Sequence, residues 1–303
     1  MAAHFQGFIV TTLLAGAVAV TGCSETKSTS AKARPAATPA GQAVPTSFTP
    51  DAPPVVPVLT TPMTFRDGEA AYHAGNFAEA TTIFTRLTDE KPEHAWGHYM
   101  LALSAAKTGD VATAEKAFDE ALRIDPTHVK SLVNSARLLI EQKRTDEAIV
   151  RLDKAVELEP ASAATHRLFG RAYAAQGQVE EAISAYEQAI GLDEKDSWSL
   201  NNLGLLLFEQ GRAADAVPLL TRAVALQKGV PAFHNNLGMA LEHTGQFSAA
   251  AAAYGEALVA DAGYEKAKRN LSRVEGRKDR PSAEAVVATP AVEERGNPGQ
   301  AQR

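Results

Sequence analysis

Residues 197–230 read SWSLNNLGLLLFEQGRAADAVPLLTRAVALQKGV, and residues 231–264 read PAFHNNLGMALEHTGQFSAAAAAYGEALVADAGY. When the second stretch is written below the first, the motif Asn-Asn-Leu-Gly falls in register, beginning at Asn201 and at Asn235. The two motifs are 34 residues apart, which is the length of each stretch. This region therefore consists of two copies of a 34-residue repeat.

The same spacing extends toward the N-terminus in three columns of residues. Alanine fills one column without exception, at Ala80, Ala114, Ala148, Ala182, Ala216 and Ala250. A second column holds only small residues, namely Gly68, Ala102, Ala136, Gly170, Gly204 and Gly238. A third column holds large apolar residues, namely Phe84, Phe118, Leu152, Tyr186, Leu220 and Tyr254. The columns predict six units, at 61–94, 95–128, 129–162, 163–196, 197–230 and 231–264.

A glycine divides nearly every unit into two helical stretches. These glycines are Gly75, Gly109, Gly177, Gly211 and Gly245. Because glycine reaches the left-handed backbone conformation without a steric penalty, it ends the first helix and turns the chain. The third unit has Lys143 at this position. We expect that turn either to carry strain of about 1 kcal/mol or to adopt a slightly different geometry.

A 34-residue unit with these columns resembles the tetratricopeptide repeat. The resemblance covers about two thirds of the chain and implies an all-α fold, in which six antiparallel helix hairpins stack into an α-solenoid. Beyond the last unit, Ala267, Leu271 and Val274 follow helical spacing. This spacing predicts a capping helix at 265–275.

The N-terminal residues have the features of a secretory signal. An uncharged run of 13 residues begins at Phe8, and it is too short for a bilayer span, which needs roughly 20 apolar residues. The tetrapeptide Val-Thr-Gly-Cys that ends at Cys23 resembles the lipobox of bacterial lipoproteins. That resemblance implies a signal peptide at 1–22, lipidation of Cys23 and, with Ser24 following, sorting to the outer membrane facing the periplasm. A plain signal peptide and an uncleaved anchor are the alternatives.

Prolines are concentrated on both sides of the repeats. Seven lie between Pro35 and Pro57, and three lie between Pro281 and Pro298. Proline lacks a backbone donor and fixes φ, and these segments contain too few apolar residues to form a core. We therefore predict a disordered tether at 23–60 and a disordered tail at 276–303.

Composition and motifs argue against several functional classes. The net charge of −6 makes a nucleic-acid partner unexpected, and the chain has no phosphate loop, no dinucleotide fingerprint and no HExxH motif. We expect no enzymatic activity, cofactor, bound metal or small-molecule substrate. His98, His166 and His234 recur every 68 residues, and we interpret them as packing or half-exposed residues. Carboxylates such as Glu180 and Glu181 are interpreted as solvated.

The family resemblance also implies a binding surface, because the first helix of each unit lines the inner face of such a solenoid. The residues placed there are Trp96, Tyr99, Lys130, Asn134, Arg137, Arg167, Arg171, Trp198, Asn201, Asn202, Asn235 and Asn236. The cations form a positive patch, the asparagines can both donate to and accept from a peptide backbone, and the aromatic rings suit binding hot spots. They predict a groove for an extended peptide that is acidic or C-terminal. Alternatively, they are ordinary polar residues on a solvated face.

Together these features predict a membrane-anchored scaffold or adaptor that holds a partner protein in the bacterial cell envelope. The layout resembles pilotins and the pilus-assembly and secretion lipoproteins of Gram-negative bacteria. A binder or regulator of cell-wall hydrolases or proteases is one alternative. A purely structural assembly subunit without a peptide groove is another.

Overall fold

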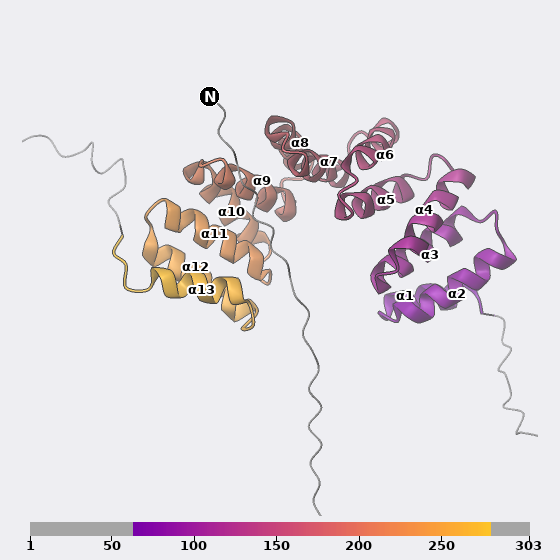
Figure 1. The fold of residues 1–303 in the computed structure, drawn as a ribbon, viewed down its shortest axis with the longest axis horizontal. Helices are drawn as coiled ribbons and strands as arrows, with labels where there is room; N and C mark the ends of the chain where they lie inside the picture. The colour runs from indigo at the N-terminus through magenta and orange to yellow at the C-terminus, as the bar shows by residue number, and fades with distance from the viewer. Residues whose placement is uncertain (1–62, 280–303) are drawn as a thin grey trace, which may run out of the picture. The chain divides into compact units, whose positions relative to one another are not determined.

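Thirteen helices and no strand make up residues 63–279, the part of the chain that the computed structural model describes (Figure 1). The first three units comprise α1 (Phe65–His73) with α2 (Phe77–Glu90), α3 (Ala95–Thr108) with α4 (Val111–Ile124), and α5 (Val129–Glu141) with α6 (Thr145–Leu158). The next three comprise α7 (Ala163–Ala175) with α8 (Val179–Leu192), α9 (Ser197–Glu209) with α10 (Ala213–Leu226), and α11 (Pro231–His243) with α12 (Phe247–Ala260), and α13 (Glu265–Val274) follows. The predicted all-α repeat fold is confirmed. The predicted signal peptide, Cys23, the tether and residues 280–303 of the tail lie outside the described residues.

The order of packing shows which helices line the inner face. Each helix packs against the next one along the chain, and each first helix also contacts the first helix of the following unit. Among the described helices, the backbones of second helices in neighbouring units stay further apart, although an ion pair of 2.6 Å joins Arg151 on α6 to Asp119 on α4. Because neighbouring units approach most closely on the inside of a bend, the first helices lie on the inner side of the stack and α11 contacts α13 in the same way.

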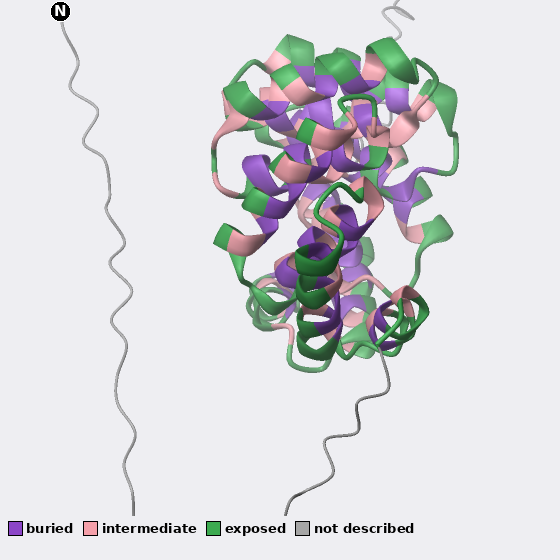
Figure 2. Cartoon of the chain, turned by 90° about the vertical axis from the view of Figure 1, so that its right-hand side faces the viewer, coloured by how far each residue is buried: buried purple, intermediate pink, exposed green. Residues whose placement is uncertain are grey.

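The columns of the sequence form the core between these helices. All six alanines of the constant column have no exposed surface, and buried residues lie where helices face one another (Figure 2). The small residues face the large apolar ones within a unit. A Cβ added to Gly238 would lie 2.5 Å from the ring of Tyr254, and one added to Gly170 would lie 2.6 Å from the ring of Tyr186. The small column therefore permits the close crossing of the two helices in a hairpin.

The turns within the units follow the glycine pattern. The five predicted glycines have φ between 75° and 84°. Lys143 takes the same conformation, with a φ of 64°, and it is the one non-glycine residue with positive φ in the described part of the chain. The third unit thus keeps the common turn and carries the strain, rather than adopting a different geometry.

The turns between units are closed in two ways that alternate along the chain. After α2, α6 and α10, a histidine Nε2 donates to the carbonyl oxygen six residues earlier, with His98 to Pro92 at 2.8 Å, His166 to Pro160 at 3.2 Å and His234 to Lys228 at 2.7 Å. After α4, α8 and α12, an aspartate accepts from the backbone N–H two residues later, namely Asp125 at 2.9 Å, Asp193 at 3.0 Å and Asp261 at 2.8 Å. Since a carbonyl can only accept, each histidine carries its proton on Nε2. We name these the histidine closure and the aspartate closure.

The C-terminal end of the repeats is fixed by more than the capping helix. Arg273 donates to Glu242 on α11 at 2.7 Å. The Arg277 guanidinium lies 3.9 Å from the centroid of the Phe247 ring, and Asp279 accepts from the Ser248 N–H at 2.8 Å. Two residues at the start of the predicted tail, Arg277 and Asp279, therefore contact α12, because an aromatic ring and a helix N-terminus give them partners.

Candidate peptide-binding groove

Five of the residues predicted for the groove form one network on α3 and α5. The Trp96 and Tyr99 ring centroids are 5.0 Å apart, and Lys130 Nζ lies 4.9 Å from the Trp96 ring centroid. Asn134 Nδ2 donates to Tyr99 Oη at 3.3 Å, and Arg137 Nη1 donates to Asn134 Oδ1 at 3.2 Å. The structure thus brings these residues together, but both ends of the Asn134 amide already have partners within the protein.

Three guanidinium groups converge where α5 and α7 meet. Arg137, Arg167 and Arg171 line a cavity of about 460 Å³ together with Trp198 and Asn202. The pKa of Arg137 is lowered, first by partial loss of water and then by the like charges of the other two arginines, although part of its side chain stays exposed. Like charges gathered around one cavity favour the binding of an anion there.

Two of these arginines have different environments. Arg167 Nη1 donates to Asp196 Oδ2 at 2.6 Å, and the Asp196 side chain is only 4% exposed. Ser199 Oγ donates to the same oxygen at 2.6 Å, and Asp196 is the N-cap of α9. Arg171 makes no hydrogen bond and no ion pair with any described residue, and it also lines an adjoining cavity of about 310 Å³. Asp196 is the last residue of unit four but caps α9, so its bond with Arg167 ties α7 of unit four to the first helix of unit five. Arg171 remains available to a ligand.

The asparagines join neighbouring units more than they face solvent. Asn236 Nδ2 donates to Asn201 Oδ1 at 3.0 Å, and Asn270 Nδ2 donates to Asn235 Oδ1 at 2.9 Å. Asn201 and Asn235 are buried. Asn270 is not among the predicted residues, although it follows Asn235 by the same 35-residue step that separates Asn201 from Asn236. These bonds link α9 to α11 and α11 to α13 and occupy Asn236 Nδ2, so an asparagine ladder for a peptide would have to rely on Asn202 and on the side-chain oxygen of Asn236.

Trp198 is the most exposed aromatic side chain of the groove. It is 46% exposed, and its ring meets the buried Phe233 ring edge-on, with centroids 4.9 Å apart. An exposed indole held by a buried ring is a rigid apolar surface of the kind that binding sites use. It borders the cavity that Arg171 lines, so the groove combines a cation with a flat apolar anchor.

The described residues also bear on metal binding and on membrane insertion. Between residues 63 and 279, no group of histidine, cysteine, aspartate and glutamate side chains is placed to hold a metal ion. None of the helices in that range has the length and apolar character needed to cross a bilayer. The predicted lipidation site, Cys23, lies outside this range.

Three family models match the chain. A TPR repeat model matches residues 170–211, a tetratricopeptide repeat model matches residues 201–270, and the middle TPR-like domain of cilia and flagella-associated protein 70 matches residues 68–190. All three describe the same class of helix hairpin, and none describes a catalytic domain. The chain therefore contains tetratricopeptide repeats, as its spacing predicted. No curated protein matches this sequence.

Solved structures share the fold. The APC/C hetero-tetramer Cut9-Hcn1 matches with 19% identity and a TM-score of 0.60 over 69% of this chain, which spans only 41% of the matched chain. A tetratricopeptide repeat protein from Parabacteroides merdae matches with 17% identity and a TM-score of 0.58, covering 69% of this chain and 82% of the other. A thermophilic TPR protein from Thermus thermophilus matches with 19% identity and a TM-score of 0.52, covering 60% and 98%. Identities this low establish a repeat scaffold and nothing about the partner.

Proposed function

We propose that this chain, a carrier of tetratricopeptide repeats with a cationic inner groove, is an adaptor that binds an extended acidic segment of a partner protein. The observation that carries the proposal is Arg171, a half-buried cation with no anionic partner among the described residues, in a cavity it shares with Arg137. A carboxylate from a partner would supply the missing counter-charge through charge-assisted hydrogen bonds. Trp198 beside it would hold an apolar side chain of the same segment.

The net charge of the whole protein is opposite in sign to the excess of positive charge in the groove. The chain has a net charge of −6, so an acidic peptide would be repelled by most of its surface and attracted at the groove. Electrostatic complementarity of this kind favours one docking position over others. The asparagines contribute less than the sequence suggested, since Asn201 and Asn235 are occupied in bonds between units.

The adaptor would act at a membrane. The Val-Thr-Gly-Cys sequence ending at Cys23 supports lipid anchoring, and Ser24 supports the periplasmic face of the outer membrane. More than one acyl chain on Cys23 would give stable attachment. A long proline-rich tether between the anchor and the repeats would let the groove reach a partner away from the bilayer. Because this layout resembles that of pilus-assembly and secretion lipoproteins, we propose that the protein acts in the assembly of a pilus or secretion complex.

Binding of defined peptides tests the groove. Fluorescence anisotropy would follow a labelled Gly-Ser-Asp-Glu-Asp-Glu peptide with a free C-terminus, against a neutral Gly-Ser-Asn-Gln-Asn-Gln amide. We expect the acidic peptide to bind and Arg171→Gln to weaken it roughly tenfold. Lys116→Gln is the matched control, because Lys116 is an exposed cation on α4, a second helix. Equal loss in both variants, or equal binding of both peptides, would favour a purely structural subunit without a groove.

The anchor and the partner need separate experiments. Incorporation of a fatty-acid analogue into the native chain but not into Cys23→Ser would support lipidation, and equal labelling of both would refute it. Crosslinking in intact cells followed by pulldown would separate the partner classes. Pilus or secretin components would support the assembly role, whereas hydrolases or proteases would instead make the protein a regulator of cell-wall enzymes.

A further inference from the structure

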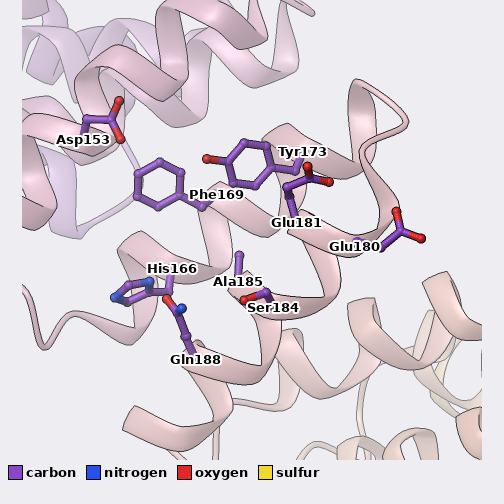
Figure 3. A pocket seen from close by; sticks show the side chains of 9 residues that line it. All are labelled: Asp153, His166, Phe169, Tyr173, Glu180, Glu181, Ser184, Ala185 and Gln188. Atoms are coloured by element: carbon purple, nitrogen blue, oxygen red, sulfur yellow. The ribbon is translucent and has the colours of Figure 1, made fainter.

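A second cavity opens on the opposite face of α7 from the groove. Successive helical residues are separated by about 100° around the axis, so Phe169 and Tyr173 lie opposite Arg167 and Arg171. The cavity has a volume of about 450 Å³ and lies among α6, α7 and α8 (Figure 3). It is separate from every residue predicted for the groove.

Two aromatic rings form the centre of this cavity. Phe169 and Tyr173 are stacked, with centroids 5.8 Å apart and planes 15° from parallel. Phe169 is buried and Tyr173 is half-buried, so the pair is fixed in the structure while one ring remains accessible. His166 also lines the cavity, and its Nε2 proton is engaged in a histidine closure. The rings thus offer a rigid, flat surface rather than a mobile one.

Carboxylates surround the rings on two sides. Asp153 lies on the α6 side and Glu181 on the α8 side, and Glu180 extends outward from the start of α8 (Figure 3); all three side chains are exposed. None of the three forms an ion pair in the described part of the chain, and no lysine or arginine lines the cavity. The pKa of Tyr173 is raised, first by burial and then by the charges of Asp153 and Glu181.

We propose that this cavity binds an arginine side chain of a partner protein. A guanidinium group is flat and cationic, so it can stack on the Tyr173 ring while its N–H groups donate to Asp153 and Glu181. A lysine ammonium lacks the planar face, and an anionic or neutral side chain would leave three carboxylates without a counter-charge. The repeats would then contact partners on two faces, with an acidic segment in the groove and a basic one on the outside.

The test is an NMR titration of the full chain with labelled tyrosine side chains. The probe is acetyl-Gly-Arg-Gly amide, and the matched probe carries citrulline, which has the same shape without the charge. Tyr173→Phe assigns the Tyr173 signal among the six tyrosines. We expect the arginine probe to shift that signal and the citrulline probe to leave it in place at the same concentration.

Two double variants separate a specific site from general attraction to an acidic protein. Asp153→Asn with Glu181→Gln should weaken the arginine probe about fivefold or more. Glu187→Gln with Glu256→Gln makes the same change in charge at two exposed residues outside the cavity, and should weaken it less than twofold. Arg171→Gln should leave this binding unchanged, so the result is independent of the groove. An unmoved Tyr173 signal, equal shifts with citrulline, or equal losses in the two double variants would overturn the proposal.

Discussion

Replacing Arg167 by leucine should destabilise the repeats, whereas the same replacement of Arg171, one turn along the same helix, should not. Both changes remove one positive charge from the same cavity. Only the first breaks an ion pair, since Arg167 Nη1 lies 2.6 Å from an Asp196 carboxylate that is 4% exposed. The comparison therefore isolates the pair from the loss of charge.

The expected loss of stability depends on the hydrogen bonds that Asp196 keeps when Arg167 is replaced. Removal of one partner from a fully buried pair costs about 3–5 kcal/mol. Asp196 retains the bonds from the Ser199 hydroxyl and amide, and the Arg167 side chain is 23% exposed, so water can partly replace it. We therefore expect a loss of about 2–3 kcal/mol in the free energy of unfolding for Arg167→Leu, and a change within about 0.5 kcal/mol for Arg171→Leu.

Urea unfolding followed by far-UV circular dichroism would measure both values. Since the ion pair joins unit four to unit five, Arg167→Leu should also broaden the transition if the two halves begin to unfold separately. A double-mutant cycle with Asp196→Asn would give the coupling between the two side chains. Equal stability of the two arginine variants would refute the assignment of Arg167 to structure and return it to the groove.

Three further predictions concern packing, strain and pH. Gly238→Ala should lower the free energy of unfolding by about 1–3 kcal/mol, because the added methyl group overpacks the helix crossing. Gly255→Ala should raise it by up to about 1 kcal/mol, because the new Cβ would meet no atom within 4 Å, so thermal melts should show a lower melting temperature for the first variant and a higher one for the second. Lys143→Gly should raise stability by up to about 1 kcal/mol by relieving the positive φ, and an unchanged urea midpoint would mean that the turn is unstrained. Glu242→Gln should cost about 1 kcal/mol at neutral pH, since the pKa of Glu242 is lowered, first by the hydrogen bond from Arg273. A lowered carboxylate pKa stabilises the fold at pH values above the ordinary pKa of 4.5, and this stabilisation is lost as the pH falls through the lowered pKa. The free energies of unfolding of the native protein and of Glu242→Gln should therefore become equal in acid, and a difference that persists there would exclude this cause.

The fold could be predicted from the sequence because its constraints repeat. Each alanine of the constant column must be small for the same reason in every unit, and six copies make that reason visible. The turn glycines are equally easy to recognise in the sequence, and Lys143 is the one non-glycine residue with positive φ in the described part of the chain. Local rules of this kind depend only on residues within one hairpin or its neighbour.

The groove was harder to predict because several of its side chains bind side chains of neighbouring helices instead of facing solvent. Arg167 and Asp196 are 29 residues apart, and whether they meet depends on how far unit five is rotated relative to unit four. The step of 35 residues between Asn201 and Asn236 reflects the same rotation, which moves the contact one position beyond the repeat length. The sequence therefore predicts which side chains face inward, but not which of them satisfy each other.

The cavity between α6, α7 and α8 could not be predicted from the sequence for a different reason. Glu181 is exposed, as expected for a solvated carboxylate, and its own helix shows no sign of the cavity beside it. Its position beside the Phe169 and Tyr173 pair, with Asp153 beyond it, arises only when α6 and α8 pack on α7. No periodic signal marks that combination, because the aromatic pair occurs in one unit.

The alternation of histidine and aspartate closures defines a module for protein engineering. Each kind recurs after 68 residues, so two consecutive hairpins are the shortest segment that can be copied or removed without placing two like closures side by side. A longer version of this protein should accordingly be built in steps of four helices.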